Sequence, residues 1–170
     1  MKARLICTVL ALLLPILLVC GCTVQRLSLE EYRTEMESAF KGWSSSVVEW
    51  ASTYAEYVMI NGEDGEYAAF QENKALIRQK LDVIDERLDA IEKVGLPPEE
   101  YDEMHRRLMS GVKTEREWLD YWYKACSANS ETDFRSASGK AAEISTETED
   151  ALPSVYMEMH MKLKYGDTAY

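Results

Sequence analysis

Hydrophobic side chains recur at alternating intervals of three and four residues along four long segments of the chain, as they do on one face of an α-helix. The segments cover residues 28–61, 66–94, 98–127 and 131–164. The second segment is the most regular, and its apolar positions are Tyr67, Phe70, Ile77, Leu81, Ile84, Leu88 and Ile91. The pattern predicts an all-α fold built from four amphipathic helices.

Residues typical of helix ends lie at the boundaries of these segments. Ser28 and Glu31 have the spacing of a capping box, which would start the first helix. Residues 61–65 contain two glycines and predict a turn, and Gly95 followed by two prolines predicts the end of the second helix. Pro153 lies inside the fourth segment, where we expect a kink or a short break.

Four long helices joined by short connections favour an up-down-up-down four-helix bundle over residues 28–165, followed by a C-terminal tail of residues 166–170. In this topology the starts of the first and third helices lie at one end of the bundle, together with the ends of the second and fourth. A domain of this length can bury a core of its own.

The chain begins with the basic residues Lys2 and Arg4 and an apolar run over residues 5–18, followed by Val19-Cys20-Gly21-Cys22. These four residues resemble the lipobox of bacterial lipoproteins. The resemblance implies that residues 1–21 are a signal peptide and that Cys22 becomes the lipidated first residue, with residues 22–27 as a short tether. It further implies an extracytoplasmic domain anchored to the cell membrane, at the outer membrane if the cell has two.

Two other interpretations of the N-terminus are weaker. A membrane span needs about 20 apolar residues, and Pro15 interrupts a run that ends in the small residue Gly21, so a cleaved signal is favoured. An ordinary secreted protein cut near Gly21 is the remaining alternative. Two or three acyl chains on Cys22 would supply the several hydrophobic contacts that stable anchoring needs.

The charge of the chain excludes some partners. Its net charge is −11, and without residues 1–21, which hold Lys2 and Arg4, 17 basic and 30 acidic side chains remain, hence −13. A surface this acidic argues against binding to nucleic acid and against adsorption onto anionic lipid. Cys126 would be the one thiol left in the mature chain, so neither an intrachain disulfide nor a thiolate zinc site is expected.

The sequence contains no pattern of an enzyme, and we expect neither catalysis nor a cofactor. A phosphate-binding glycine loop and an HExxH motif are both missing. Di-iron bundles need Glu-x-x-His segments on two facing helices, and the closest approach in this chain is the single segment Asp102-x-x-His105. Met157 and His160 are three residues apart and could present soft ligands to Cu(I) from one helical face. Packing in the core is the simpler explanation of these two residues.

An aromatic cluster is the strongest candidate for a ligand site. The predicted bundle brings together Trp50, Tyr54, Trp118 and Trp122 opposite small residues of the fourth helix, among them Ser138, with Glu115 nearby. Large side chains packed against small ones would explain the cluster, and so would a pocket between helices. The first hypothesis for function is therefore a module that binds another envelope protein, the second a binder of small apolar or aromatic molecules, and the third a copper binder.

Two charged residues interrupt the apolar stripes. Lys74 and Glu115 lie at similar heights on neighbouring helices of the predicted bundle, so they could form an ion pair inside it. Alternatively, the long side chain of Lys74 reaches solvent from the edge of the stripe.

Overall fold

The computed structural model describes residues 25–147 and 151–166, so the predicted signal peptide and Cys22 lie outside the described residues. The described residues form helices and no strands, which confirms the predicted all-α class. The α-helices are α2 (Leu29–Tyr57), α3 (Gly62–Glu92), α4 (Asp102–Ser127), α5 (Glu131–Glu147) and α6 (Leu152–Tyr165), and the short 3-10 helices are η1 (Met59–Asn61) and η2 (Glu99–Tyr101).

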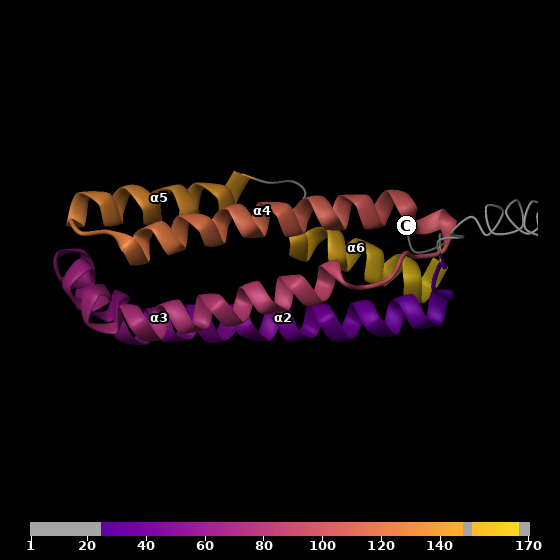
Figure 1. Cartoon of the computed structure of the whole chain (residues 1–170), viewed down its shortest axis with the longest axis horizontal. Coiled ribbons are helices and arrows are strands. Elements are labelled where there is room, and N and C mark those ends of the chain that lie inside the picture. Colours follow the sequence, from indigo (N-terminus) through magenta and orange to yellow (C-terminus); the bar gives the residue numbers. More distant parts are fainter. Residues whose placement is uncertain (1–24, 148–150, 167–170) are drawn as a thin grey trace, which may run out of the picture.

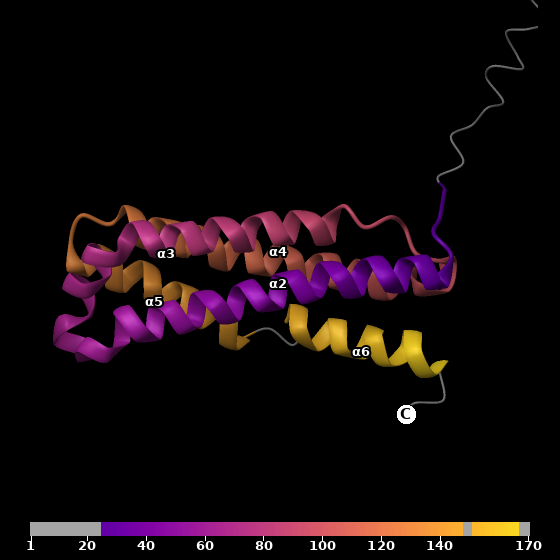
Figure 2. The ribbon, with the colours of Figure 1, turned by 90° about the horizontal axis from the view of Figure 1, so that it is seen from below.

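The helices run along one long axis. Helices α2, α3 and α4 extend over most of its length, whereas α5 and α6 follow one another along it (Figures 1 and 2). Helix α3 packs against α2 and α4, and both α5 and α6 pack against α4. Helix α6 also contacts α2, so the two short helices together cover the side of the molecule that α3 leaves open.

The hydrophobic core follows the predicted stripes. Phe70, Ile77, Leu81, Ile84, Leu88 and Ile91 of α3 have no exposed surface. On α4, Leu108, Val112 and Leu119 are buried in the same way. Burial of side chains of this size stabilises the fold by about 1.5 to 3 kcal/mol each, which makes this apolar contact the main source of stability.

The first connection is tighter than the sequence predicts. Helix α2 ends at Tyr57, and α3 already begins at Gly62 rather than at residue 66. The chain reverses through η1, after which Gly62 adopts a positive φ of 67°. Glycine reaches this conformation without a steric penalty, so the remaining residues of the predicted turn are free to form the first turn of α3.

The second connection also differs by a few residues from the prediction. Helix α3 ends at Glu92, two residues before the predicted end, and η2 precedes α4, which starts at Asp102 instead of residue 98. Pro98 stands directly before η2 with an extended ψ of 149°. The short 3-10 turn therefore occupies the place of the first helical turn predicted there.

The fourth predicted helix is divided into two. Instead of one helix over residues 131–164, α5 ends at Glu147 and α6 starts at Leu152. Pro153 lies in the first turn of α6, where its missing N–H removes no helical hydrogen bond. The predicted interruption thus separates two helices, and residues 148–150 between them lie outside the described residues.

The last residues of the predicted tether belong to the domain. The backbone N–H of Leu27 donates to the Leu96 carbonyl at 2.9 Å, and the Arg26 guanidinium binds both carboxylate oxygens of Asp102 at 2.5 and 2.8 Å. A Cβ at Gly95 would lie 2.9 Å from Cγ of Leu27, so glycine gives Leu27 the space to pack there. The chain therefore enters the domain at Arg26, before α2 begins.

An ion cluster fixes α3 against α4. Arg116 of α4 binds Asp85, Asp89 and Glu92, which lie one turn apart on α3, and its Nη2 is 2.6 Å from Asp89 and 2.8 Å from Glu92. Isolated surface ion pairs add little stability, but one guanidinium shared by three carboxylates forms a network. The cluster aligns the two helices along their length.

The predicted capping box is confirmed and generates a test of helix stability. The Glu31 N–H donates to the Ser28 hydroxyl at 3.3 Å, and the Glu31 carboxylate accepts from the Ser28 N–H at 2.8 Å. Ser28→Ala should lower the free energy of unfolding by about 1 kcal/mol, measured by urea titration, because it removes this cap. Ser45→Ala, at an exposed position inside α2, should change it by less than about 0.5 kcal/mol. Equal effects would contradict a role for the cap.

Candidate functional site

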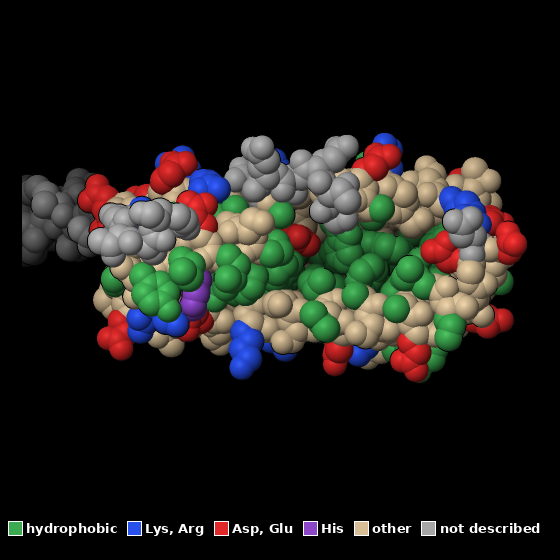
Figure 3. Space-filling model, turned by 180° about the vertical axis from the view of Figure 1, so that it is seen from behind, with side chains coloured by type: hydrophobic (Ala, Val, Ile, Leu, Met, Phe, Trp, Pro, Cys, Tyr) green, Lys and Arg blue, Asp and Glu red, His purple; other side chains and the backbone are tan. Residues whose placement is uncertain are grey.

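A groove of about 430 Å³ opens on the face where α5 and α6 meet, a size typical of small-molecule sites. Its floor comes from α2 and α4, and its rim from the end of α5 and the start of α6. Figure 3 shows this face of the molecule, on which hydrophobic side chains line a long depression. The lining residues are Trp43, Val47, Trp50, Thr114, Glu115, Trp118, Trp122, Ala142, Ile144, Ala151 and Pro153.

Helical periodicity places these side chains on one wall. Trp43 and Trp50 are seven residues apart on α2, and Glu115, Trp118 and Trp122 follow one another at intervals of three and four on α4. Residues at these spacings share a helical face. The rim residues are smaller than the tryptophans, and the indole rings form the floor of the groove with 3 to 9% of their surface exposed.

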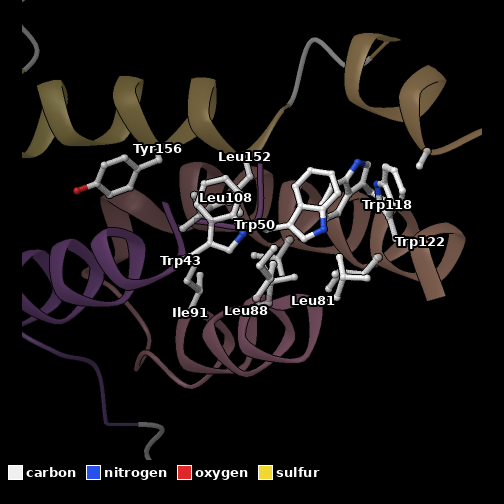
Figure 4. Packing of buried hydrophobic residues seen from close by; sticks show 14 of the residues in the cluster. Trp43, Trp50, Leu81, Leu88, Ile91, Leu108, Trp118, Trp122, Leu152 and Tyr156 are labelled. Carbon is white, nitrogen blue, oxygen red and sulfur yellow. The ribbon is translucent and has the colours of Figure 1, made fainter. Parts of the chain in front are cut away.

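The aromatic rings support one another. Trp50 meets Trp118 and Trp122 edge to face, with both centroid distances at 4.9 Å and interplanar angles of 83° and 65°. In Figure 4 the labelled tryptophans lie in a row, with Leu81 and Leu88 of α3 beneath them. Edge-to-face contacts of this kind stabilise the rings by about 0.5 to 1.5 kcal/mol beyond burial. The wall of the groove is therefore formed before any ligand binds.

Three indole N–H groups of the groove have no hydrogen-bond partner within the described part of the chain. They are the Nε1 atoms of Trp43, Trp50 and Trp122, all of them buried. An unsatisfied buried donor costs about 1 to 3 kcal/mol, and contact with a neighbouring ring face recovers only part of that cost. Leucine or phenylalanine would fill the same space without it. Dense packing alone therefore does not explain why these positions hold tryptophan.

Glu115 is the one titratable side chain among the described residues that line the groove. It is half-buried, and neither a cation nor a hydrogen-bond donor of the described residues contacts its carboxylate. Burial raises the pKa of Glu115 to about 7. The carboxyl group therefore takes up and releases its proton near neutral pH, which an exposed glutamate does not do.

The predicted ion pair between Lys74 and Glu115 is wrong. Lys74 donates to the side-chain oxygen of Gln71 on its own helix at 3.0 Å. Burial raises the pKa of Cys126, and the positive charge of Lys74 opposes this rise. Glu115, in contrast, lines the groove. Arg116 of α4 pairs with Asp89 of α3 and Tyr123 with Asp82, so Lys74 lies well beyond Glu115 along the bundle axis and the predicted equal height is wrong.

The structure divides the predicted pocket residues between two places. Trp50, Glu115, Trp118 and Trp122 meet in the groove, whereas Tyr54 and Ser138 line a shallower depression beside it that shares Trp122. The Tyr54 hydroxyl is occupied, since it donates to Glu66 at 2.7 Å.

Sequence reasoning placed Ala142 opposite the aromatic cluster but missed Trp43, Val47, Thr114, the rim residue Ile144 and the two residues at the start of α6. The position of Trp43 one heptad before Trp50 was a usable signal. The rim was not predictable in this way, because it depends on the break before α6.

The two copper candidates differ in their surroundings. Met157 is largely exposed, whereas His160 is half-buried with its Nδ1 3.3 Å from Glu37. No group of three or more His, Cys, Asp or Glu side chains that could hold a metal ion occurs among the residues that the structure describes.

Other chemically reactive side chains lie outside the groove. Cys126 is buried, and burial raises the pKa of its thiol to about 11, so it is protonated and a poor nucleophile at neutral pH. Nδ1 of His105 is hydrogen-bonded to the hydroxyl of Tyr32 at 2.9 Å, and burial lowers the pKa of the imidazole. The two groups are on different parts of α4, and neither lines the groove.

The pKa of Glu115 generates a prediction for stability against pH. The unfolded chain loses the Glu115 proton above its ordinary pKa of 4.5, whereas the folded chain keeps it until about pH 7. The folded state binds more protons in this window, so the contribution of Glu115 to stability falls as the pH rises from 4.5 to 7. Glu115→Gln should therefore gain stability relative to the parent across this window, measured by urea unfolding at a series of pH values.

The matched control for this prediction is Glu117→Gln on the same helix. Glu117 is exposed, so this variant should follow the parent at every pH. A stability difference between Glu115→Gln and the parent that stays constant with pH would contradict the proposed burial of the carboxyl group.

The groove combines an aromatic wall with indole donors and a carboxylate that have no partner among the described residues. Comparison of the chain with protein-family models, with curated proteins and with solved structures finds no match. The function is therefore inferred from the residues of the groove themselves.

Proposed function

We propose that this protein is a non-catalytic binder of small molecules with an apolar, largely aromatic body, and that the groove at the break between α5 and α6 is its binding site. The observation that carries the proposal is the groove beside α5 and α6 that four largely buried tryptophans line. Small-molecule sites are typically concave and apolar, with a few polar groups that orient the ligand. The groove has this composition, because Thr114 and Glu115 are its polar residues.

Rigid aromatic walls favour binding for a thermodynamic reason. The indole rings are held by their edge-to-face contacts and by the α3 core beneath them, so little conformational freedom is lost when a ligand stacks on them. A flat apolar ligand would also displace water from ring surfaces that solvate poorly. The tryptophans would therefore contribute to ligand binding in addition to packing in the core.

The residues of the groove support binding rather than catalysis. The Thr114 hydroxyl donates to the backbone carbonyl of Ser110 at 3.3 Å, which keeps it within its own helix. Among the described residues that line the groove, Glu115 has no second acid or base beside it, whereas nucleophilic and acid–base catalysis both need such a partner.

We further propose that lipid on Cys22 holds the domain at the outer face of a membrane and that residues 1–21 are removed as a signal peptide. Among the described residues, no helix combines the length and the apolar character needed to cross a bilayer. The chain enters the domain at the end where α2 and α4 begin and α3 and α6 end (Figure 2). This arrangement supports an up-down-up-down four-helix bundle in which α5 and α6 share the fourth position.

One surface supports the alternative function, binding to another envelope protein. Met157, Met161 and Tyr165 lie four residues apart on α6 and are exposed by 55%, 37% and 53%. They form an apolar stripe along one side of the helix, as a helix-binding partner would require. The groove supports a more specific proposal than this stripe, because it has a defined shape and chemistry.

Binding in the groove can be tested with the neutral fluorescent dye N-phenyl-1-naphthylamine and the full-length chain. We expect dye fluorescence to rise on binding, with a dissociation constant on the order of 100 μM or below, since ligands gain about 0.3 kcal/mol per non-hydrogen atom. Ala142→Phe should weaken binding by about tenfold, because it fills the groove from the rim. Ala55→Phe, at an exposed alanine of α2 outside the groove, should not. Equal binding by both variants would disprove the site.

The anchor can be tested separately by Cys22→Ser in the organism that makes the protein. The parent should fractionate with membranes, and the variant should be released or retain its signal segment, because serine cannot accept the thioether-linked lipid. Mass spectrometry of the mature N-terminus gives the measurement. A parent chain that begins at another residue and carries no lipid would contradict the proposal.

A further inference from the structure

We propose that the groove selects ligands that carry a protonated amine beside their apolar body, with Glu115 as the counter-ion of the amine and the tryptophan faces as its surroundings. This inference rests on the proposed function and adds the charge of the ligand to it. Three features of the groove support it.

The first feature is that no described residue contacts the Glu115 carboxylate as a cation or a hydrogen-bond donor. The helices packed around it contribute apolar side chains to the groove, namely Trp43, Val47 and Trp50 from α2 and Ala142 and Ile144 from α5, with Ala151 and Pro153 at the start of α6. Helix α3 contributes none, and Arg116 beside Glu115 is held by three carboxylates of α3. A half-buried carboxylate without a cation is costly, and a bound ammonium group would supply that cation.

The second feature is the kind of aromatic side chain around this carboxylate. The indole face carries the strongest negative potential among the aromatic side chains, so a cation within about 6 Å of its centre is attracted to it. Glu115 lies one turn from Trp118 and two turns from Trp122 on the same face of α4. An amine that reaches the carboxylate therefore approaches indole faces, and the remaining apolar body of the ligand lies against Trp43 and Trp50.

The third feature is the charge of the molecule. The net charge of −11 attracts cations and repels anions over the whole surface. An anionic ligand would in addition be repelled by Glu115 and by the ring faces. A neutral ligand would fit the apolar wall but would leave the carboxyl group without a partner.

Binding of an amine is coupled to a proton. Burial raises the pKa of Glu115 to about 7, so below that pH the empty groove holds a neutral carboxylic acid. When a protonated amine binds, the Glu115 carboxyl group releases its proton to solvent and the carboxylate pairs with the ammonium group, so one proton leaves for each ligand bound. The affinity for the amine should therefore rise as the pH increases through 7, whereas the affinity for a neutral ligand should not.

The experiment compares three compounds of similar shape as competitors of the dye described above. These are 2-phenylethylamine, which is cationic, 2-phenylethanol, which is neutral, and 3-phenylpropionate, which is anionic. At about pH 8 the amine should displace the dye at a concentration about tenfold lower than the alcohol, and the anion should be the weakest. In Glu115→Gln the advantage of the amine over the alcohol should disappear, whereas in Glu117→Gln, at an exposed position of α4, it should persist.

The outcomes separate the two proposals. If the dye binds in the groove but the alcohol or the anion competes as well as the amine, the inference is wrong and the proposed function stands. An advantage of the amine that survives in Glu115→Gln would also overturn the inference. If the dye does not bind, the proposed function itself fails. Far-ultraviolet circular dichroism of each variant, with unfolding by urea, shows that it is folded.

Discussion

The structure depends on how the apolar faces of α2 and α4 are covered. On one side, α3 covers them along their whole length with a continuous stripe that includes Leu81 and Leu88. On the other side the cover consists of two short helices, and the second starts at a proline. Proline cannot continue a regular helix from the preceding turn, so α6 begins anew beside the tryptophan wall. The groove is thus a consequence of backbone chemistry at one position.

The tryptophans illustrate a conflict between packing and polar satisfaction. Three buried indole donors lack partners within the described residues, although smaller apolar side chains would avoid this cost. The rule that buried polar groups are hydrogen-bonded is usually broken at sites where a protein binds a ligand or carries out a reaction. The edge-to-face contacts of Trp50 hold the rings in place, so their orientation is fixed without a hydrogen bond.

The distribution of charge leads to the same site. Other charged side chains at the helix interfaces form ion pairs, as Arg116 does with three carboxylates and Arg26 with Asp102. Glu115 differs, because its side chain lies among indole rings and small rim residues. Its carboxyl group therefore titrates near neutral pH, and its charge is available to a ligand.

The sequence by itself determined the helical class, the capping box at Ser28, the interruption near Pro153 and most of the tryptophan wall, because these depend on spacing of three and four residues or on one residue's backbone chemistry. Tertiary structure alone decided the rest. The tight reversal at Gly62, the docking of Arg26 on Asp102 and the separation of Lys74 from Glu115 depend on how the elements pack against one another. Periodicity shows which side chains share a helical face, whereas the register of one helix against the next follows from contacts between residues far apart in the chain.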